Sequence, residues 1–282
     1  MKQYLSFTAI VLLLVTFAIS TGCDSGDEPI PSEEESRIPI SFSTEESSSR
    51  GISVSAYSMS EFPLKGYVVD SYKYMDVTVR RRSDGSWGTD VPYYWPPRGE
   101  SMQFCAVYGA PSSEFLLVNS WENNPQLQTY YYSVKRTVSD QKDIIYALSE
   151  VCNYHAVPDR HVRLNFRHVL ASVKLNIVGD ITHISSIEFR NLWGSGVFSP
   201  DKMSWELKGP WGGDAEKHTY VIPVDGKEIS EENRTMFLIP QLTPFDATVA
   251  ITHSDGSVKE QPFSWHNFFM EANNTVTITL SQ

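Results

Sequence analysis

The sequence predicts an all-β protein in which two β-sandwich domains follow one another along the chain. From Ile38 onward, apolar and polar residues alternate with a period of two, and Val, Ile, Tyr, Phe and Thr are enriched. Clusters of Gly, Pro, Asn and Ser interrupt this alternation roughly every ten residues, as turns between short strands do. No long segment has a comparable helical period.

Short β-strands account for most of the alternating segments, and we expect them in the following order. The first-half strands span residues 38–42, 52–57, 66–70, 75–80, 102–108, 115–118, 129–134 and 143–148. The second-half strands span residues 162–166, 169–177, 184–190, 203–208, 218–223, 236–239, 247–253 and 275–280. The segment 169–177 is the clearest of them, because its apolar and polar residues alternate almost without exception.

Two domains follow from this number of strands. About sixteen strands exceed the seven to nine that an immunoglobulin-like sandwich uses, so two sandwiches are the simpler arrangement. Pro158 and Asp159 interrupt the strand pattern between the two halves. We therefore predict an N-terminal β-sandwich at residues 38–158 and a C-terminal β-sandwich at residues 159–282.

The N-terminus has the pattern of a bacterial lipoprotein signal peptide, residues 1–22. Lys2 precedes an apolar run of secretory length, which is too short to favour a membrane-spanning helix. Gly22 and then Cys23 follow the run, as in a lipobox, so we expect processing between them and acylation of Cys23. Two or three acyl chains anchor a protein stably in a bilayer. The alternative is an ordinary secretory peptide with an incidental cysteine.

Acidic residues dominate the next segment, residues 23–37, which we expect to be a flexible tether. From Asp24 to Glu46 the chain carries eight Asp and Glu residues against a single arginine, Arg37. Such a segment cannot bury enough apolar surface to fold. The whole chain has a formal net charge of −11, which argues against nucleic acid as a partner.

Catalytic and metal-binding motifs are absent from the sequence, so we predict neither an enzyme nor a cofactor. It contains no nucleophile elbow, zinc-protease motif or phosphate-binding loop. The nearest group of histidines is His155, His161 and His168, but an odd separation places His161 and His168 on opposite faces of a strand. The remaining cysteines, Cys105 and Cys152, are compatible with one disulfide or with two buried thiols.

Three tryptophans lie close together in the sequence near predicted loops: Trp193, Trp205 and Trp211. Such residues could form a surface on which sugar rings stack. Aromatic residues in a β-sandwich also serve as ordinary core or turn packing. Both interpretations remain open at this stage.

Five segments together resemble the fimbrillin-like, or Mfa-like, family of Bacteroides-group surface lipoproteins. In chain order the segments are 38–42 (IPISF) with Arg50 and Gly51 downstream, 85–108 with its GSW and YYWPP motifs, 141–147 (QKDIIYA), 162–173 (VRLNFRHVLASV) and 237–241 (FLIPQ). They occur in the order of the family and follow a lipobox. The acidic residues Asp24, Asp27 and Glu28 also resemble the signal that sends such lipoproteins to the outer face of the outer membrane.

The resemblance implies two transthyretin-like β-sandwiches and a role in a fimbrium rather than in catalysis. In fimbrial members an arginine-specific protease removes the first strand, and a strand from another subunit fills the groove. Carried onto this chain, cleavage falls between Arg50 and Gly51. The apolar plugs of the leaving strand are then Ile38, Ile40 and Phe42, and the donor-strand plugs are Val276, Ile278 and Leu280.

Two functions remain in competition. The first is a fimbrial or fimbria-associated subunit that assembles with other subunits or with copies of itself by strand exchange and serves cell adhesion. The second is a monomeric outer-membrane surface lipoprotein that binds glycan or host protein through distal loops. We expect the protein, anchored by the lipid on Cys23, to lie in the outer membrane and to be exposed at the cell surface, or to lie in a fimbrium if it is processed.

Overall fold

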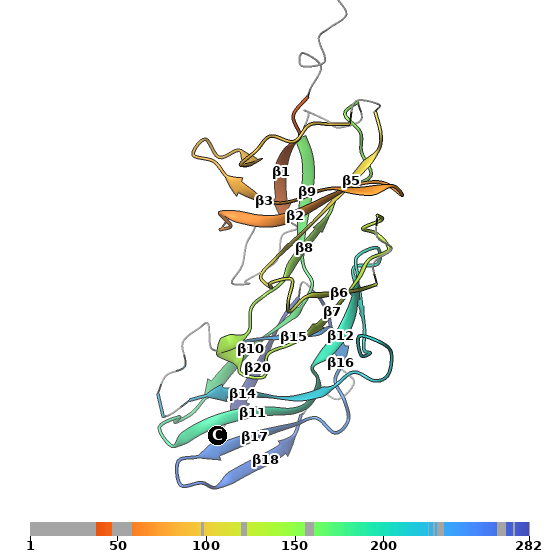
Figure 1. Cartoon of the computed structure of the whole chain (residues 1–282). Helices are drawn as coiled ribbons and strands as arrows, with labels where there is room; N and C mark the ends of the chain where they lie inside the picture. The colour runs from red at the N-terminus through yellow and green to blue at the C-terminus, as the bar shows by residue number, and fades with distance from the viewer. Residues whose placement is uncertain are drawn as a thin grey trace, which may run out of the picture. The chain divides into compact units, whose positions relative to one another are not determined.

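The computed structural model describes residues 38–46, 58–96, 99–119, 123–155, 161–224, 226–227, 229, 234–263, 269–272 and 274–281. These residues fold into strands and turns, with one short 3-10 helix, η1 (Val138–Asp140) (Figure 1). The prediction of an all-β protein is confirmed. Among the described residues, no helix has the length and apolar character needed to cross a bilayer.

The strands of the first half are β1 (Ser41–Glu46), β2 (Glu61–Val68), β3 (Tyr72–Arg81), β4 (Trp87–Thr89), β5 (Met102–Tyr108), β6 (Leu116–Asn119), β7 (Thr129–Ser133) and β8 (Ile145–Leu148). The strands of the second half are β9 (His161–His168), β10 (Ala171–Val178), β11 (Ile184–Trp193), β12 (Ser195–Ser199), β13 (Ser204–Glu206), β14 (Lys217–Pro223), β15 (Thr235–Leu238), β16 (Gln241–Leu242), β17 (Thr248–His253), β18 (Val258–Pro262), β19 (Phe269–Met270) and β20 (Thr275–Ser281).

Seven strands form a closed barrel in the order β1-β4-β3-β2-β5-β8-β9. Strand β9 shows how the sequence dictates the barrel wall, because its residues are alternately exposed and buried along its whole length. His161 is exposed and His168 is buried, which confirms that they lie on opposite faces. The barrel encloses a core of large apolar side chains, among them Phe62, Leu64, Val79, Met102, Phe104, Leu164 and Phe166.

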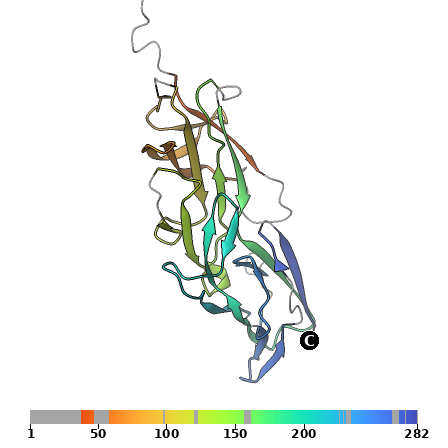
Figure 2. The same ribbon diagram turned by 90° about the vertical axis from the view of Figure 1, so that its right-hand side faces the viewer.

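The remaining strands form four smaller sheets around a second, larger core. Their orders are β15-β10-β20, β14-β11-β17-β18, β13-β12-β7-β6 and β16-β19. The larger core contains Leu175, Ile187, Phe189, Phe198, Tyr220, Ile222, Val249 and Ile251. Figure 2, turned by 90° from Figure 1, shows β20 (violet-blue) near the C-terminus, and β20 pairs with β10.

The barrel strands come from both sides of residue 158. Strand β9 pairs in parallel with β1 and antiparallel with β8, both of which precede the predicted boundary. Residues 38–282 form one compact unit by their contacts. The division into domains at 38–158 and 159–282, and the transthyretin-like arrangement of each, stay predictions.

The two cysteines among the described residues, Cys105 and Cys152, are both free thiols. Cys105 is buried and Cys152 is half-buried. Burial raises the pKa of each thiol to about 11, so both stay protonated and unreactive near neutral pH. Of the two arrangements left open by the sequence, the structure has two separate thiols.

Candidate functional site

Strand β1 closes the barrel by pairing with β9 along its whole length. The two strands run parallel in continuous register from Ser41 opposite His161 to Glu46 opposite Phe166. Figure 1 shows them side by side, β1 in brown-red and β9 in green. In this register the buried Phe42 of β1 lies beside the buried Val162 of β9.

The other side of β1 is held by the segment around the YYWP motif. The backbone N–H of Ile40 donates to the carbonyl of Tyr93 at 2.7 Å, and the N–H of Trp95 donates to the carbonyl of Ile38 at 2.9 Å. Slightly further along, Phe42 pairs with Trp87 of β4. The segment 38–46 therefore has partners on both sides, with β9 along Ser41–Glu46 and the YYWP segment and β4 at residues 38–42.

The apolar side chains of this segment point into the barrel. Ile40 is 6% exposed and Phe42 is 3% exposed, while Ile38 packs half-buried against the same core. The ring of Phe42 meets the ring of Phe104 edge-on, with centroids 5.7 Å apart. The strand thus supplies part of the barrel core as well as part of its wall.

Strand β20 has a related but less enclosed setting. It runs parallel to β10 in register from Thr275 opposite Ser172 to Ser281 opposite Val178. It lies at the end of the sheet order β15-β10-β20, so among the described residues only one of its edges belongs to a ladder. Ile278 and Leu280 are buried in the larger core, and Val276 is half-buried.

The predicted processing residues Gly22, Cys23, Arg50 and Gly51 lie outside the described residues. The predicted tether, residues 23–37, lies outside them too. Arg50 follows the end of β1 by four positions in the sequence. Lipidation and cleavage are therefore untested by the geometry.

The three tryptophans have different environments. Trp193 is half-buried, and the ammonium of Lys217 lies 5.0 Å from the centroid of its ring. Trp205 is half-buried against the larger core, and its indole N–H donates to the carbonyl of Val169 at 2.6 Å. Trp211 is 85% exposed. Only Trp211 presents most of its surface to solvent.

Two of the sequence motifs meet through a buried polar contact. Nδ1 of His168 lies 2.5 Å from a carboxylate oxygen of Asp143, and both side chains are almost fully buried. Asp143 belongs to the 141–147 motif and His168 to the 162–173 motif. The sequence alone does not reveal this pairing, because the two residues are 25 positions apart and leave no local pattern.

Two buried glutamines bind backbone groups: Gln141 of the 141–147 motif and Gln241 of the 237–241 motif. The amide oxygen of Gln141 accepts from the N–H of Phe237 at 2.7 Å, and its amide N–H donates to the carbonyl of Lys135 at 2.8 Å. The side chain of Gln241 pairs with both the N–H and the carbonyl of Trp193, each at 2.8 Å. Such contacts satisfy backbone groups that a ladder leaves unpaired.

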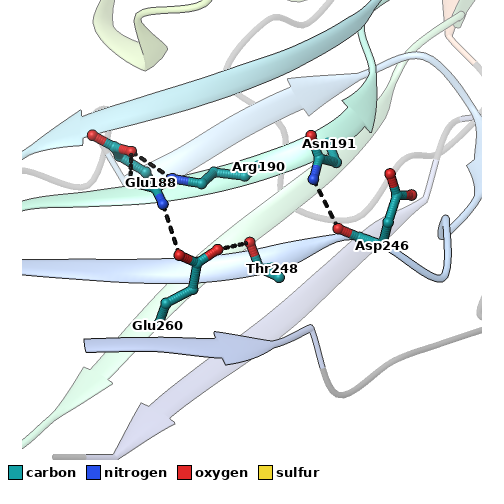
Figure 3. A network of polar contacts seen from close by, with 6 residues as sticks. All are labelled: Glu188, Arg190, Asn191, Asp246, Thr248 and Glu260. Atoms are coloured by element: carbon teal, nitrogen blue, oxygen red, sulfur yellow. Dashed lines mark hydrogen bonds and ion pairs between the residues drawn. The ribbon is translucent and has the colours of Figure 1, made fainter. Parts of the chain in front are cut away.

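A second polar network crosses the outer face of the sheet β14-β11-β17-β18 (Figure 3). The guanidinium of Arg190 contacts Glu188 on its own strand at 2.7 Å and reaches Glu260 on the edge strand β18 at 2.8 Å. The other carboxylate oxygen of Glu260 accepts from the hydroxyl of Thr248 at 2.6 Å. The network fastens β18 to two strands at once.

Among the described residues, no group of three or more His, Cys, Asp or Glu side chains is placed to hold a metal ion. The buried Asp143–His168 pair opens on no solvent, since both side chains are at most 1% exposed. The geometry shows two strands, β1 and β20, that each run parallel to a neighbouring strand. The apolar side chains of β1 lie in the barrel core, and those of β20 lie in the larger core.

A model of the fimbrillin-like family matches residues 43–282. The chain belongs to the fimbrillin-like family. This membership supports a structural or adhesive role rather than a catalytic one. No curated protein matches the sequence.

Solved structures share the fold of this fimbrillin-like chain. A protein from Bacteroides ovatus, proposed to act in cell adhesion, has a TM-score of 0.60 at 14% identity, covering 87% of this chain and 92% of its own. A protein from Bacteroides uniformis, proposed to act in cell adhesion, has a TM-score of 0.54 at 14% identity, with coverages of 86% and 93%. A fimbrial protein from Bacteroides vulgatus has a TM-score of 0.51 at 13% identity, with coverages of 86% and 95%.

Proposed function

We propose that this protein is a fimbrial or fimbria-associated surface subunit that assembles by β-strand exchange and serves cell adhesion. In this proposal the precursor is acylated at Cys23 and carried to the outer membrane. A protease then cuts between Arg50 and Gly51, which releases β1. Its partners are other fimbrial subunits or further copies of itself.

The observation that carries the proposal is the place of β1 in the barrel. Its removal strips β9 of a continuous parallel ladder and leaves the carbonyl of Tyr93 and the N–H of Trp95 without their partners. It also uncovers the side of Phe104 that Phe42 contacts. Unpaired strand edges and open apolar pockets favour the addition of a strand from another chain.

The C-terminal strand has the side-chain spacing that such a groove needs. Val276, Ile278 and Leu280 repeat the two-residue spacing of Ile38, Ile40 and Phe42. Strand β20 already runs parallel to its partner, as β1 does. We therefore assign these three residues as donor plugs and Ile38, Ile40 and Phe42 as the plugs of the leaving strand.

The first test is the mass of the N-terminal peptide of the protein recovered from the cell surface. A terminus at Gly51 supports removal of the lipid and of β1. A terminus at acylated Cys23 means that the barrel keeps its own strand and the protein acts as an anchor or as a separate surface protein. Arg50→Ala is the matched variant and should retain the Cys23 terminus.

The second test removes the donor strand. A chain lacking residues 275–282 should reach the cell surface but form no heat-resistant oligomers. Normal oligomers from that truncation would rule out the donor assignment. Because residues 278 and 280 also fill the larger core, protease resistance of the truncated protein must be measured alongside.

A second candidate function, glycan or host-protein binding, is favoured by one observation, the 85% exposure of Trp211. The residue lies in the turn between Lys208 and Asp214, where the N–H of Gly209 donates to the carbonyl of Gly213 at 3.1 Å. A rigid turn that presents an indole ring suits stacking on a sugar or on an apolar side chain.

Glycan-array binding separates this second candidate from simple assembly. Trp211→Ala should abolish saturable binding without altering the thermal unfolding midpoint. Trp205→Ala is the matched control for stability, because its ring packs against the larger core. If Trp211→Ala leaves all binding intact, the second candidate is wrong.

A further inference from the structure

The indole of Trp95 is buried in the barrel without an acceptor for its N–H. Trp95 is 6% exposed and belongs to the barrel core. Among the described residues, no atom accepts a hydrogen bond from its Nε1. Buried tryptophans usually have a partner for this group, because an unpaired donor removed from water lowers stability. The indole N–H is therefore a polar group that a better-matched neighbour would satisfy.

The backbone contacts show which residue of the N-terminal segment lies opposite Trp95. Pro39 forms an antiparallel bridge with Tyr94, and the backbone N–H of Trp95 donates to the carbonyl of Ile38 at 2.9 Å. In this register Ile38 stands directly opposite Trp95, and both side chains pack on the barrel core. Residues opposite one another on the same face have Cβ atoms about 5 Å apart. Position 38 is therefore the cross-strand neighbour of the indole.

The segment 38–46 matches this part of the barrel imperfectly. The ring of Phe104 meets the indole of Trp95 with centroids 6.1 Å apart, and on another side it meets the ring of Phe42 at 5.7 Å. The apolar surroundings suit the apolar side chains of the segment. Ile38, however, has no acceptor atom in its side chain, so the segment fills the barrel and leaves the indole donor unsatisfied.

We propose that the Trp95 indole selects the incoming strand, by favouring one that carries a side-chain acceptor opposite Trp95 and apolar residues at the following inward positions. This selection rests on the strand exchange proposed above. A site with a buried donor discriminates against partners that leave the donor unpaired. The preferred ligand is an extended segment that begins with Asn, Gln, Ser or Thr at position 38, where the leaving segment has isoleucine.

The C-terminal strand of the chain has this pattern. Asn274 precedes the three donor plugs at the same two-residue spacing. With Asn274 at position 38, the plugs follow at positions 40, 42 and 44, and position 44 lies beside the buried Leu164 of β9. This register places the side-chain carbonyl of Asn274 opposite the indole. Asn274 is exposed in the sheet of its own subunit, so a substitution there leaves the larger core intact.

The acceptor preference is tested first in the intact full chain, where no strand is exchanged. Ile38→Thr and Ile38→Val give side chains of the same shape, but only threonine offers an acceptor. In urea unfolding, threonine should be favoured over valine by roughly tenfold in the folding equilibrium constant, and Trp95→Phe should remove this advantage. At position 40, the same two substitutions should show no dependence on Trp95.

A spectroscopic measurement separates a hydrogen bond from a general effect on packing. With isotope-labelled tryptophan, the indole proton of Trp95 should move downfield and exchange more slowly with water in Ile38→Thr than in Ile38→Val. Trp95→Phe assigns the signal, because it removes that signal alone. An indole signal that is the same in both variants, together with equal stability, overturns the selection and leaves strand exchange standing.

The second experiment asks whether the same preference selects the donor. Asn274→Leu in the full chain should reduce heat-resistant oligomers at the cell surface roughly tenfold, whereas Asn274→Thr should retain them. Thr279→Leu is the matched control on the exposed face of β20 and should leave them unchanged. Normal oligomers of Asn274→Leu overturn the selection. If the unmodified chain forms no such oligomers, strand exchange itself is wrong and the selection fails with it.

Discussion

Strands β1 and β20 are both added in parallel to neighbouring strands of the chain, but they are not equally well held. Strand β1 is bonded on one side to β9 and on the other to Trp87 and the YYWP segment. Strand β20 is bonded to β10 alone among the described strands. Strands β9 and β10 are themselves separated by only Val169 and Leu170. The comparison teaches that a strand added in parallel can close a barrel between two neighbours, as β1 does, or end a sheet beside a single described neighbour, as β20 does.

The largest expected effect comes from removing each strand. A chain that begins at Gly51 should lose the cooperative unfolding of the barrel, because a ladder and two core side chains are missing. A synthetic peptide of residues 38–46 should restore it. Truncation after residue 274 should lower the unfolding midpoint by less, because one ladder edge is lost instead of two. Thermal circular dichroism measures both, and equal losses would contradict the comparison.

Single plug residues sharpen the same contrast. Phe42→Ala should lower the free energy of unfolding by about 3 to 5 kcal/mol, the usual cost of truncating a buried phenylalanine. Ile278→Ala lies in an edge strand that can relax, so we expect a loss nearer to 2 kcal/mol. Urea unfolding monitored by tryptophan fluorescence tests the order of the two, with exposed Thr279→Ala as the control for β20.

The contact between Asp143 and His168 bears on both β1 and β20. His168 is the last residue of β9, the partner of β1, and β10, the partner of β20, begins at Ala171. Asp143→Leu keeps the size of the side chain but removes this acceptor from a buried histidine. Loss of one partner of a buried hydrogen bond costs about 1 to 3 kcal/mol. Hydrogen exchange should then rise in β1 and β20 together. Faster exchange in only one of them would show that the contact does not couple the two.

A smaller, pH-dependent effect on stability is expected around the larger core, to which both β14 and β20 contribute. His218 of β14 is buried, and burial is the main cause that lowers the pKa of its imidazole below 6.5, helped by the nearby Arg136 charge. Since the unfolded chain binds this proton more readily, the His218 contribution to stability is present above about pH 6.5 and is lost as pH falls toward the folded-state pKa.

Hydrogen exchange between pH 7 and pH 5 tests this. Amides of β14 should lose protection before those of the barrel strand β9. His218→Gln should remove the pH dependence specific to β14. An unchanged pH profile in that variant would contradict the role of His218.

Several strands could be predicted from the sequence. Strands β5, β9, β11 and β17 lie within a few residues of their predicted positions, and β9 has the fully alternating burial that a period of two indicates. The missed strands lack that signal. All residues of β12 are buried and all residues of β18 are exposed, so neither alternates. Strand β4 has three residues, too few to show a period.

The candidate site followed the same rule. Ile40 and Phe42 could be picked out because an alternating apolar pattern marks a strand with one buried face. Their pairing with Tyr93, Trp95 and β9 could not, because contacts over long sequence separations leave no local pattern. The predicted strand at 52–57 lies outside the described residues.

The parallel direction of β1 along β9 has a consequence for any filament built in the proposed way. A strand that replaces β1 and keeps its direction fixes the orientation of the incoming subunit relative to the one it joins. Every subunit then has one donating and one receiving end, and all face the same way. Such a filament is vectorial: its two tips are chemically different, and growth by donor addition proceeds at one of them.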